Sequence, residues 1–264
     1  MKILALDFDG VLSDSAPECF VVGLRAYLER TEGSTLSVPV DFLVEGFAPA
    51  RERVEGDALY ARFLDLMPLG NRAEDFGIAF RALESGTAIR DQAGYDAFRS
   101  GLSEDWQQAY HERFYELRGE LSRGDPSGWE QLMGTFPQFL SVLLRRQGDA
   151  TLAIATAKDR SSVERLLRSY GIADLFPAER VLDKETGVSK VTHLRNLMAR
   201  EGVEATEITF VDDKVNHLDS TASLGVRCAL ATWGYNGARE IEIARERGYL
   251  ICTLDDVEEQ LFDA

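Results

Sequence analysis

Cysteine is scarce in this sequence, and the three present form no CxxC motif: Cys19, Cys228 and Cys252. This number and spacing predict no disulfide framework and favour a reducing cytoplasm. No apolar run approaches the roughly 18 residues that a membrane-spanning helix needs. The opening MKILALDFDG has the pattern of a strand that ends in carboxylates, and it does not resemble a secretory signal.

Basic residues are also few, with 29 Lys and Arg against 45 Asp and Glu, which gives a formal net charge of −16. Because no Lys/Arg cluster offsets this balance, nucleic acids and membranes are not expected partners. The sequence lacks GxGxxG, GxxxxGK[ST], GxSxG and HExxH motifs. Its three histidines, His111, His193 and His217, are too widely spaced to predict a zinc site.

What the sequence does contain is a set of short apolar runs of the kind buried in parallel sheets. They cover residues 2–8, 151–156, 180–182, 207–211 and 226–231. Helical patterns alternate with the later runs at 161–170, 189–201 and 215–224. This alternation predicts an α/β fold, a Rossmann-like parallel sheet with helices on both faces.

The interval between the first and second runs is far too long for a crossover loop. Its patterns are helical, at 17–29, 53–66, 72–83 and roughly 95–121. We therefore predict a mostly helical domain at 15–132, inserted after the first strand of a core made of 1–14 and 133–264. Within this insertion, Arg51 and Arg53 flank a glycine-containing bend and are candidates for binding an anionic group of a substrate, although solvated surface arginines are more common.

Two carboxylates end the first run, in the sequence LDFDGVL. Asp7 and Asp9 stand at positions i and i+2 of a strand, so both can point at one site at the carboxyl edge of the sheet. Asp9-Gly10 taken alone is equally typical of an ordinary turn.

A second acidic pair, Asp212 and Asp213, ends the run ITFVDD. Adjacent acids at the end of a buried strand are unfavourable unless a cation or another partner compensates them. Oxygen ligands of this kind suit Mg²⁺. The alternative is that one of the two carboxylates caps the next helix.

Thr156 ends the strand TLAIAT and is followed by Ala157, and at this junction a hydroxyl and backbone N–H groups can hold phosphate oxygens. A threonine in this position is more often simply a helix cap. Lys190 opens the next helical pattern and could reach back over the carboxyl ends of the strands, where it would neutralise phosphoryl charge. Lys184 is an alternative for this role.

Taken in order, these motifs resemble those of the haloacid dehalogenase superfamily. The likeness covers roughly residues 1–15 and 133–264. The resemblance implies that DFDGVL provides a nucleophile, Asp7, and an acid/base, Asp9. It implies that Thr156, with Ala157 and Gly10, binds the phosphate, and that Lys190 is the active-site lysine.

The same resemblance implies that FVDD provides Asp213 as a ligand of Mg²⁺ and Asp212 as its helper. Asp7 and the backbone carbonyl of Asp9 complete the implied metal site. Many members carry a further Asp or Asn four residues after the metal-binding Asp. Here that place is His217, and we expect Asn216, Asp219 or a water to take over its role.

The expected activity is hydrolysis of a small phosphorylated metabolite, with the helical insertion as a cap that selects it. In this scheme burial and nearby negative charge keep Asp9 protonated until it donates to the leaving oxygen. The presence of Asp9 argues against a dehalogenase. A phosphomutase uses the same motifs and stays an alternative, and a catalytically silent binding member is a weaker one. The closest resemblance is to phosphoglycolate-phosphatase-like enzymes.

Overall fold

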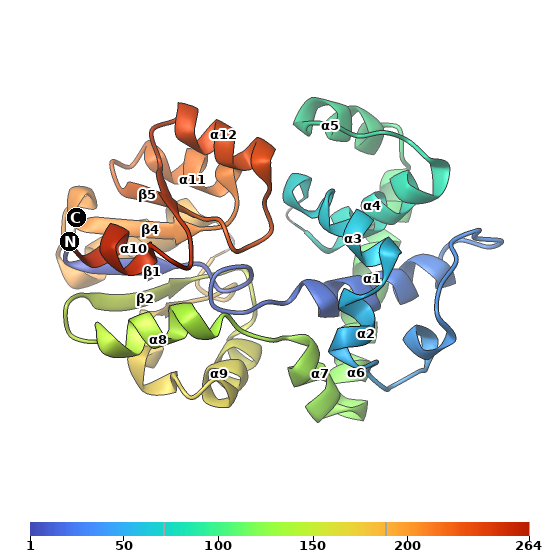
Figure 1. Cartoon of the computed structure of the whole chain (residues 1–264), viewed down its shortest axis with the longest axis horizontal. Coiled ribbons are helices and arrows are strands. Elements are labelled where there is room, and N and C mark those ends of the chain that lie inside the picture. Colours follow the sequence, from blue (N-terminus) through green and yellow to red (C-terminus); the bar gives the residue numbers. More distant parts are fainter. Residues whose placement is uncertain (71, 188, 264) are drawn as a thin grey trace. The chain divides into compact units, whose positions relative to one another are not determined.

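The computed structural model describes residues 1–70, 72–187 and 189–263, and these form two compact units. One unit combines Met1–Asp14 with Gly134–Ala264, and the other is Ser15–Met133. Figure 1 shows strands in the first unit and helices in the second. We call them the α/β unit and the helical unit.

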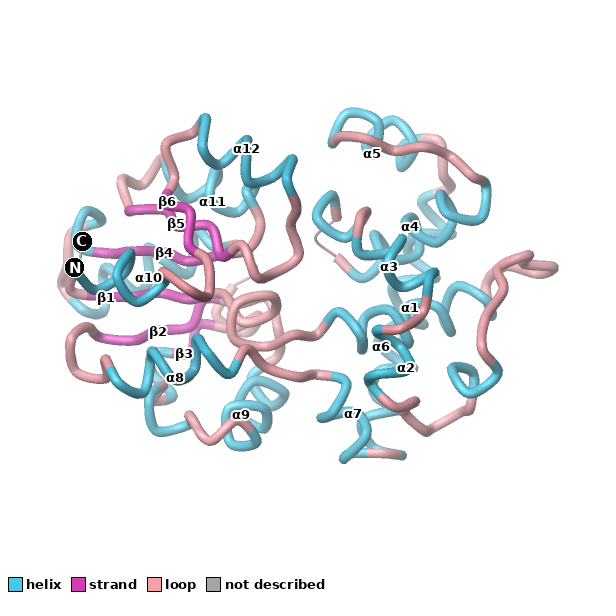
Figure 2. The backbone as a smooth tube through the Cα atoms, in the orientation of Figure 1, coloured by secondary structure: helices cyan, strands magenta, loops and turns pink. Residues whose placement is uncertain are grey.

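The α/β unit is built on a six-stranded sheet in the order β3-β2-β1-β4-β5-β6, with every neighbouring pair parallel. Figure 2 shows these strands in magenta. The strands are β1 (Ile3–Leu6), β2 (Thr151–Ala155), β3 (Val181–Leu182), β4 (Ile208–Asp212), β5 (Arg227–Ala231) and β6 (Leu250–Cys252). The predicted parallel α/β fold is therefore confirmed.

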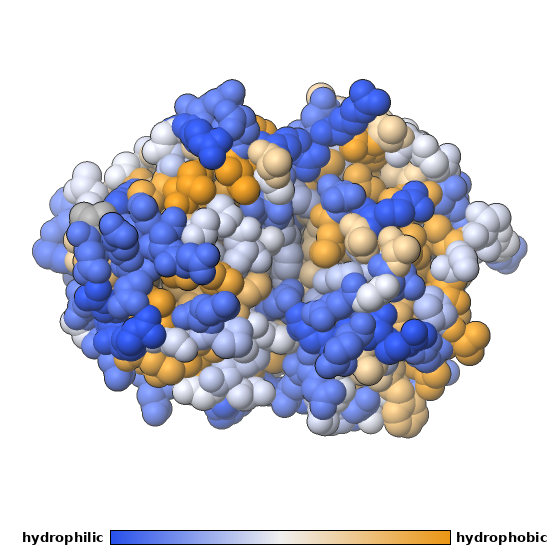
Figure 3. Space-filling view, in the orientation of Figure 1, coloured by the Kyte–Doolittle hydropathy of each residue, from blue (hydrophilic) through white to orange (hydrophobic). Residues whose placement is uncertain are grey.

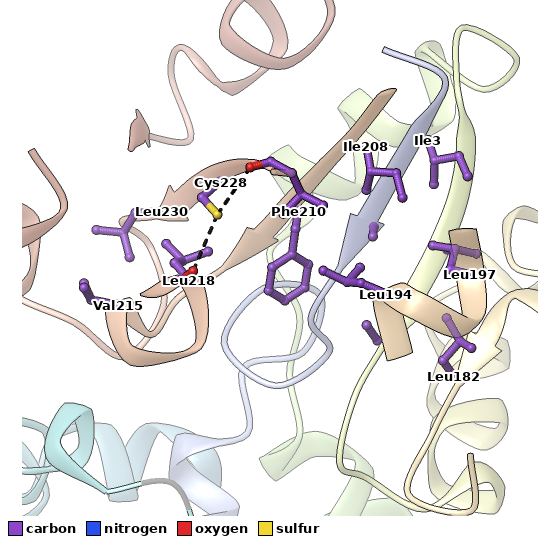
Figure 4. Packing of buried hydrophobic residues seen from close by; sticks show 14 of the residues in the cluster. Ile3, Leu182, Leu194, Leu197, Ile208, Phe210, Val215, Leu218, Cys228 and Leu230 are labelled. Carbon is purple, nitrogen blue, oxygen red and sulfur yellow. Dashed lines mark hydrogen bonds between the residues drawn. The ribbon is translucent and has the colours of Figure 1, made fainter. Parts of the chain in front are cut away.

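Helices connect these strands, as parallel pairing requires. They are α8 (Pro137–Arg145), α9 (Arg160–Ser169), α10 (Lys190–Glu201), α11 (Val215–Ala222) and α12 (Ala238–Glu246). One apolar cluster joins Ile3 and Ala5 to Leu194 of α10 and Leu218 of α11 (Figure 4). Leu4 and Leu6 alternate with the first two residues and are also fully buried. Since alternate residues of a strand face opposite sides, the sheet is covered on both faces.

The helical unit contains seven α-helices in its described residues. They are α1 (Ala16–Glu29), α2 (Arg51–Glu55), α3 (Ala58–Leu64), α4 (Ala73–Ser85), α5 (Gln92–Ser100), α6 (Glu104–Gly124) and α7 (Pro126–Leu132). Aromatic rings fill its interior, with Phe20 of α1 packed against Phe63 and Phe80. These three rings thus pack between helices α1, α3 and α4.

Several predicted element bounds were wrong. The single helices predicted at 53–66 and 95–121 are each divided in two, because Asp57 and Ser103 cap new helices at α3 and α6. Their side-chain oxygens accept backbone N–H groups of the following first turns, which favours a fresh start over continuation. The edge strand β6 and helix α12 were not predicted. A three-residue strand gives little periodicity to detect.

Hydrophilic residues cover much of the surface shown in Figure 3. Among the described residues, none of the helices combines the length and apolar character required to cross a bilayer.

Candidate active site

The register of the sheet places the acidic strand ends side by side. Leu6 of β1 lies opposite Ile154 of β2 and Val211 of β4, so Asp7 and Asp212 extend neighbouring strands at the same level. The Asp7 backbone N–H continues the ladder by donating to the Val211 carbonyl over 2.9 Å. The two carboxylates, far apart in sequence, therefore meet at the carboxyl edge of the sheet.

Lys190, the first residue of α10, reaches into this edge. Its Nζ lies 2.5 Å from Asp7 Oδ1 and 3.4 Å from Asp212 Oδ2, and it donates to the Ala155 carbonyl at 2.7 Å. Burial would lower the pKa of Lys190, but the two carboxylates outweigh it and raise the pKa above its ordinary value. Lys190 is thus a charged donor on Asp7. The alternative, Lys184, is exposed.

The charge states of Asp7 and Asp212 differ although they are neighbours. Burial and, to a smaller extent, the charge of Asp212 raise the pKa of Asp7 to about 6, against the opposing effect of Lys190. The pKa of Asp212 is lowered, because His217 and Lys190 together outweigh the effect of burial. Asp7 is therefore ionised at neutral pH but easily protonated in mild acid, as expected of a carboxylate in a functional site.

Asp213 lies against two glycines. A Cβ atom on Gly10 would come within 2.5 Å of its carboxyl carbon, and one on Gly234 within 2.3 Å of its Cβ. Asp213 Oδ2 accepts the Tyr235 backbone N–H at 2.8 Å, whereas its buried Oδ1 has no hydrogen-bond partner among the described residues. Burial and the charge of Asp212 raise the pKa of Asp213 well above its usual value.

These observations test whether the residues fit a divalent cation. An unpartnered buried carboxylate oxygen beside two further acids is the donor environment that Mg²⁺ requires. Ligand atoms of Asp7, Asp212 and His217 lie within 4.8 Å of one another, and this group is not the expected set centred on Asp213. The Asp212 oxygens, however, already contact Lys214 N, His217 and Lys190. We therefore regard Asp213 Oδ1 as the atom that most needs a cation.

His217 occupies the place where another Asp or Asn was expected. Its Nδ1 lies 3.1 Å from both oxygens of Asp212. Asp219 instead accepts the hydroxyl of Tyr249 at 2.6 Å, and Asn216 is exposed. Of these three residues, His217 is the one that contacts the acidic pair, through Asp212.

The predicted phosphate-binding residues lie at the neighbouring strand end. Thr156 follows β2, is buried, and its Oγ1 accepts the Lys158 backbone N–H at 3.1 Å. Ala157 is exposed at this edge. Gly10 adopts a φ of +83°, where a side chain would be strained, and its N–H donates to the Ser13 carbonyl.

The expected surroundings of Asp9 were wrong. We expected burial and nearby negative charge to keep it protonated, but its side chain is 34% exposed and its oxygens lie 3.1 and 3.3 Å from Lys158 Nζ. An ammonium at this distance favours the carboxylate form. Lys158, which stands two residues after Thr156, was not predicted from the sequence as a partner of Asp9.

Sequence reasoning also missed the loop after β5. Asn236 donates to the backbone carbonyls of Asp213 at 3.1 Å and Ala231 at 2.8 Å, and Trp233 Nε1 donates to Val11 O at 3.2 Å. This loop thus braces both acidic strand ends. The glycine-rich sequence WGYNG directly after a buried run was the available signal.

Arg51 and Arg53 are engaged within the helical unit. Arg51 contacts Glu55 at 2.7 Å and the Leu132 carbonyl at 3.3 Å. Arg53 is mostly exposed and lies 3.3 Å from Asp41. Their role in binding a substrate stays a prediction.

This chain is similar to curated phosphatases in sequence and to a solved structure in fold. A curated phosphoglycolate phosphatase of Synechococcus elongatus is 26% identical over 92% of this chain and 90% of its own length. A phosphoglycolate phosphatase of Aliivibrio fischeri is 23% identical, with 96% of each chain covered. Among solved structures, a haloacid dehalogenase-like family protein of Streptococcus pneumoniae superposes with a TM-score of 0.62 at 14% identity, covering 97% of this chain and 96% of the other.

A family description matches most of the chain. The model of the haloacid dehalogenase-like hydrolases covers residues 1–225, which include both acidic strand ends, Thr156 and Lys190. The chain therefore belongs to the haloacid dehalogenase-like hydrolase family.

Proposed function

We propose that this hydrolase is a Mg²⁺-dependent phosphatase that acts on a small phosphorylated metabolite through a phosphorylated Asp7. The observation that carries the proposal is the cluster at the edge of the sheet. There the Lys190 ammonium contacts the carboxylates of both Asp7 and Asp212. Close by, the charge of Asp7 acts on Asp213, whose Oδ1 has no hydrogen-bond partner in the residues that the structure describes. The site thus combines a nucleophile, Asp7, with the fixed positive charge of Lys190 and with Asp213 Oδ1, an oxygen available to a metal ion.

Asp7 is the proposed nucleophile. Its pKa of about 6 leaves it ionised at neutral pH, and the Phe8 N–H and Lys190 Nζ both contact Oδ1. Since both donors hold the same oxygen, the Asp7 carboxylate is fixed in orientation before substrate arrives. Attack of a carboxylate oxygen on phosphorus forms an acyl phosphate on Asp7 and releases the alcohol.

Asp213, Asp7 and the backbone carbonyl of Asp9 are the residues proposed to hold Mg²⁺, with Asp212 as a helper. When bound, the ion would orient the phosphate and neutralise part of its charge. Lys190 adds a fixed positive charge on the protein side, and Thr156, Ala157 and Gly10 are the residues proposed to bind the phosphate oxygens.

Asp9 is proposed to give a proton to the leaving oxygen and then to take one from the water that hydrolyses the acyl phosphate. We place the reaction in the cytoplasm, since the three cysteines are buried and form no disulfide among the described residues. The names of the relatives favour 2-phosphoglycolate or a similar small phosphate ester as substrate.

A screen of phosphorylated metabolites tests this proposal. We expect Mg²⁺-supported release of inorganic phosphate from at least one small ester and from 4-nitrophenyl phosphate. Excess chelator should abolish turnover and added Mg²⁺ should restore it, because the unpartnered Asp213 oxygen needs the cation. Turnover that persists in chelator, or a complete absence of phosphate release across the panel, would contradict the proposal.

The two candidate lysines predict different outcomes on substitution. Lys190→Met removes the ammonium that contacts Asp7 and Asp212, and we expect turnover to fall about 100-fold or more. Lys184→Met removes an exposed charge and should change turnover less than about threefold. Steady-state kinetics of both variants, with circular dichroism to compare folding, would check this. A larger loss in the Lys184 variant would reverse the assignment.

A further inference from the structure

Each of the two carboxylates in the DFDGVL motif, Asp7 and Asp9, forms an ion pair with a different lysine. Lys190 contacts Asp7, while Lys158 lies over Asp9, with Nζ 3.1 and 3.3 Å from its two oxygens. The Lys158 side chain is only 5% exposed. Because a buried ammonium is unfavourable without a partner, this pairing is specified by the fold and is not an incidental surface contact.

The backbone around Lys158 is also fixed. Its N–H donates to Thr156 Oγ1 at 3.1 Å, and its carbonyl accepts the Lys184 N–H at 3.2 Å. The lysine therefore projects from a braced turn at the end of β2, next to β1, the strand that leads to Asp9. A donor held in this way can hold its acceptor in one orientation.

The ion pair between Lys158 and Asp9 matches the ionised form that Asp9 takes in the second half of the proposed reaction. An ammonium that contacts both carboxyl oxygens pairs with an ionised carboxylate. Within the cycle proposed above, Asp9 is ionised after its proton has passed to the leaving alcohol. In the following step a water oxygen bonds to phosphorus as the bond from phosphorus to the Asp7 oxygen breaks. One water proton passes to Asp9, and Asp7 regains its carboxylate.

We infer that Lys158 is a positioning residue that orients the Asp9 carboxylate for this second, water-activating step. The inference rests on the proposed function. Lys158 acts through Asp9 and contacts neither the phosphate nor the metal in this scheme. Its removal should therefore slow hydrolysis of the phosphorylated Asp7 more than its formation.

Rapid-quench kinetics with 4-nitrophenyl phosphate separate the two steps. Nitrophenolate is a good leaving group, so the burst that reports its release needs little help from an acid. For Lys158→Met we expect a burst rate within about threefold of wild type. Steady-state turnover should fall about 10- to 100-fold, a fraction of the effect of a whole general base. Acid-quenched, phosphate-labelled protein should rise toward one phosphate per chain.

Two further variants guard against a purely structural explanation. Lys158→Arg keeps a charged donor and should recover part of the steady-state rate. Adding Lys158→Met to Asp9→Asn should produce almost no further loss, because the lysine acts through the residue already removed. Lys2→Met is the matched control, since Lys2 also pairs with a carboxylate, Glu207, but is mostly exposed at the opposite end of β1. It should change either rate less than twofold.

The results of these experiments distinguish failure of the inference about Lys158 from failure of the proposed function. If wild-type protein releases phosphate but Lys158→Met slows the burst and the steady state equally, the inference is wrong and the proposed function stands. Additive losses in the double variant lead to the same conclusion. If Lys158→Met does not fold, Lys158→Gln is judged by the same criteria. If wild-type protein releases no phosphate from any ester, both the proposed function and this inference are wrong.

Discussion

Replacing Asp7 with Asn should reduce phosphate release by roughly 10,000-fold or more, because an amide cannot replace the carboxylate as nucleophile. Asn has nearly the same shape and can still accept the Phe8 N–H that holds Asp7 Oδ1 at 2.7 Å. The substitution thus removes the chemistry while leaving the local geometry in place. Steady-state assays together with acid-quenched labelling should reveal a phosphorylated wild-type protein and an unlabelled variant.

Folding of the Asp7→Asn variant should be unimpaired. Burial raises the pKa of Asp7 to about 6, above its value in an unfolded chain, so at pH 7 the folded protein holds this carboxylate in a form that burial disfavours. Removing the charge should leave the melting temperature equal to or above that of wild type. Asp219→Asn is the control, since Asp219 pairs with Tyr249 and Arg247, and its turnover should stay near wild type. Activity above a tenth of wild type in Asp7→Asn would exclude it as nucleophile.

The largest expected effect on stability lies in the helical unit. Arg118 of α6 contacts both oxygens of Glu18 at 2.7 and 2.6 Å, and the Glu18 side chain is completely buried. Arg118→Met would leave a buried carboxylate with the Trp129 indole N–H at 3.3 Å as its remaining described donor. We expect the free energy of unfolding to fall by about 3–5 kcal/mol, measured by urea denaturation.

A second arginine on the same helix provides the comparison. Arg113 is 26% exposed and contacts surface carboxylates, among them Glu29 at 2.6 Å. Arg113→Met should lower the free energy of unfolding by less than about 1 kcal/mol. Combining Glu18→Leu with Arg118→Met should restore much of the lost stability, because no buried charge then remains unpaired. Equal losses for Arg113→Met and Arg118→Met would contradict the prediction.

Much of the fold could be predicted because apolar runs and helical spacing are local properties of the sequence. Five of the six strands were predicted, with bounds within one or two residues of those in the structure. The failures arose where local signals conflict or are short. Asp57 and Ser103 interrupt helical patterns with side-chain caps, and β6 is a short edge strand whose place depends on pairing with β5.

The sequence was sufficient to predict which residues form the candidate site, but not which of them contact one another. The sequence order of Asp7, Thr156, Lys190 and the Asp212-Asp213 pair was sufficient to nominate them, since carboxyl ends of parallel strands share one edge. Whether Lys190 or Lys184 approaches Asp7 depends on how the β3–α10 connection folds. The partner of His217 likewise depends on the first turn of α11.

By itself, the sequence determined most of the strands and helices, the strand ends that carry acids and the family, because these follow from short-range patterns. Tertiary structure decided which charged side chains pair with one another. Lys190 contacts Asp7 and Asp212, Lys158 pairs with Asp9, and one oxygen of Asp213 has no hydrogen-bond partner within the described part of the chain. Such pairings are set by distances of a few ångströms between segments remote in the chain, and burial then amplifies each charge.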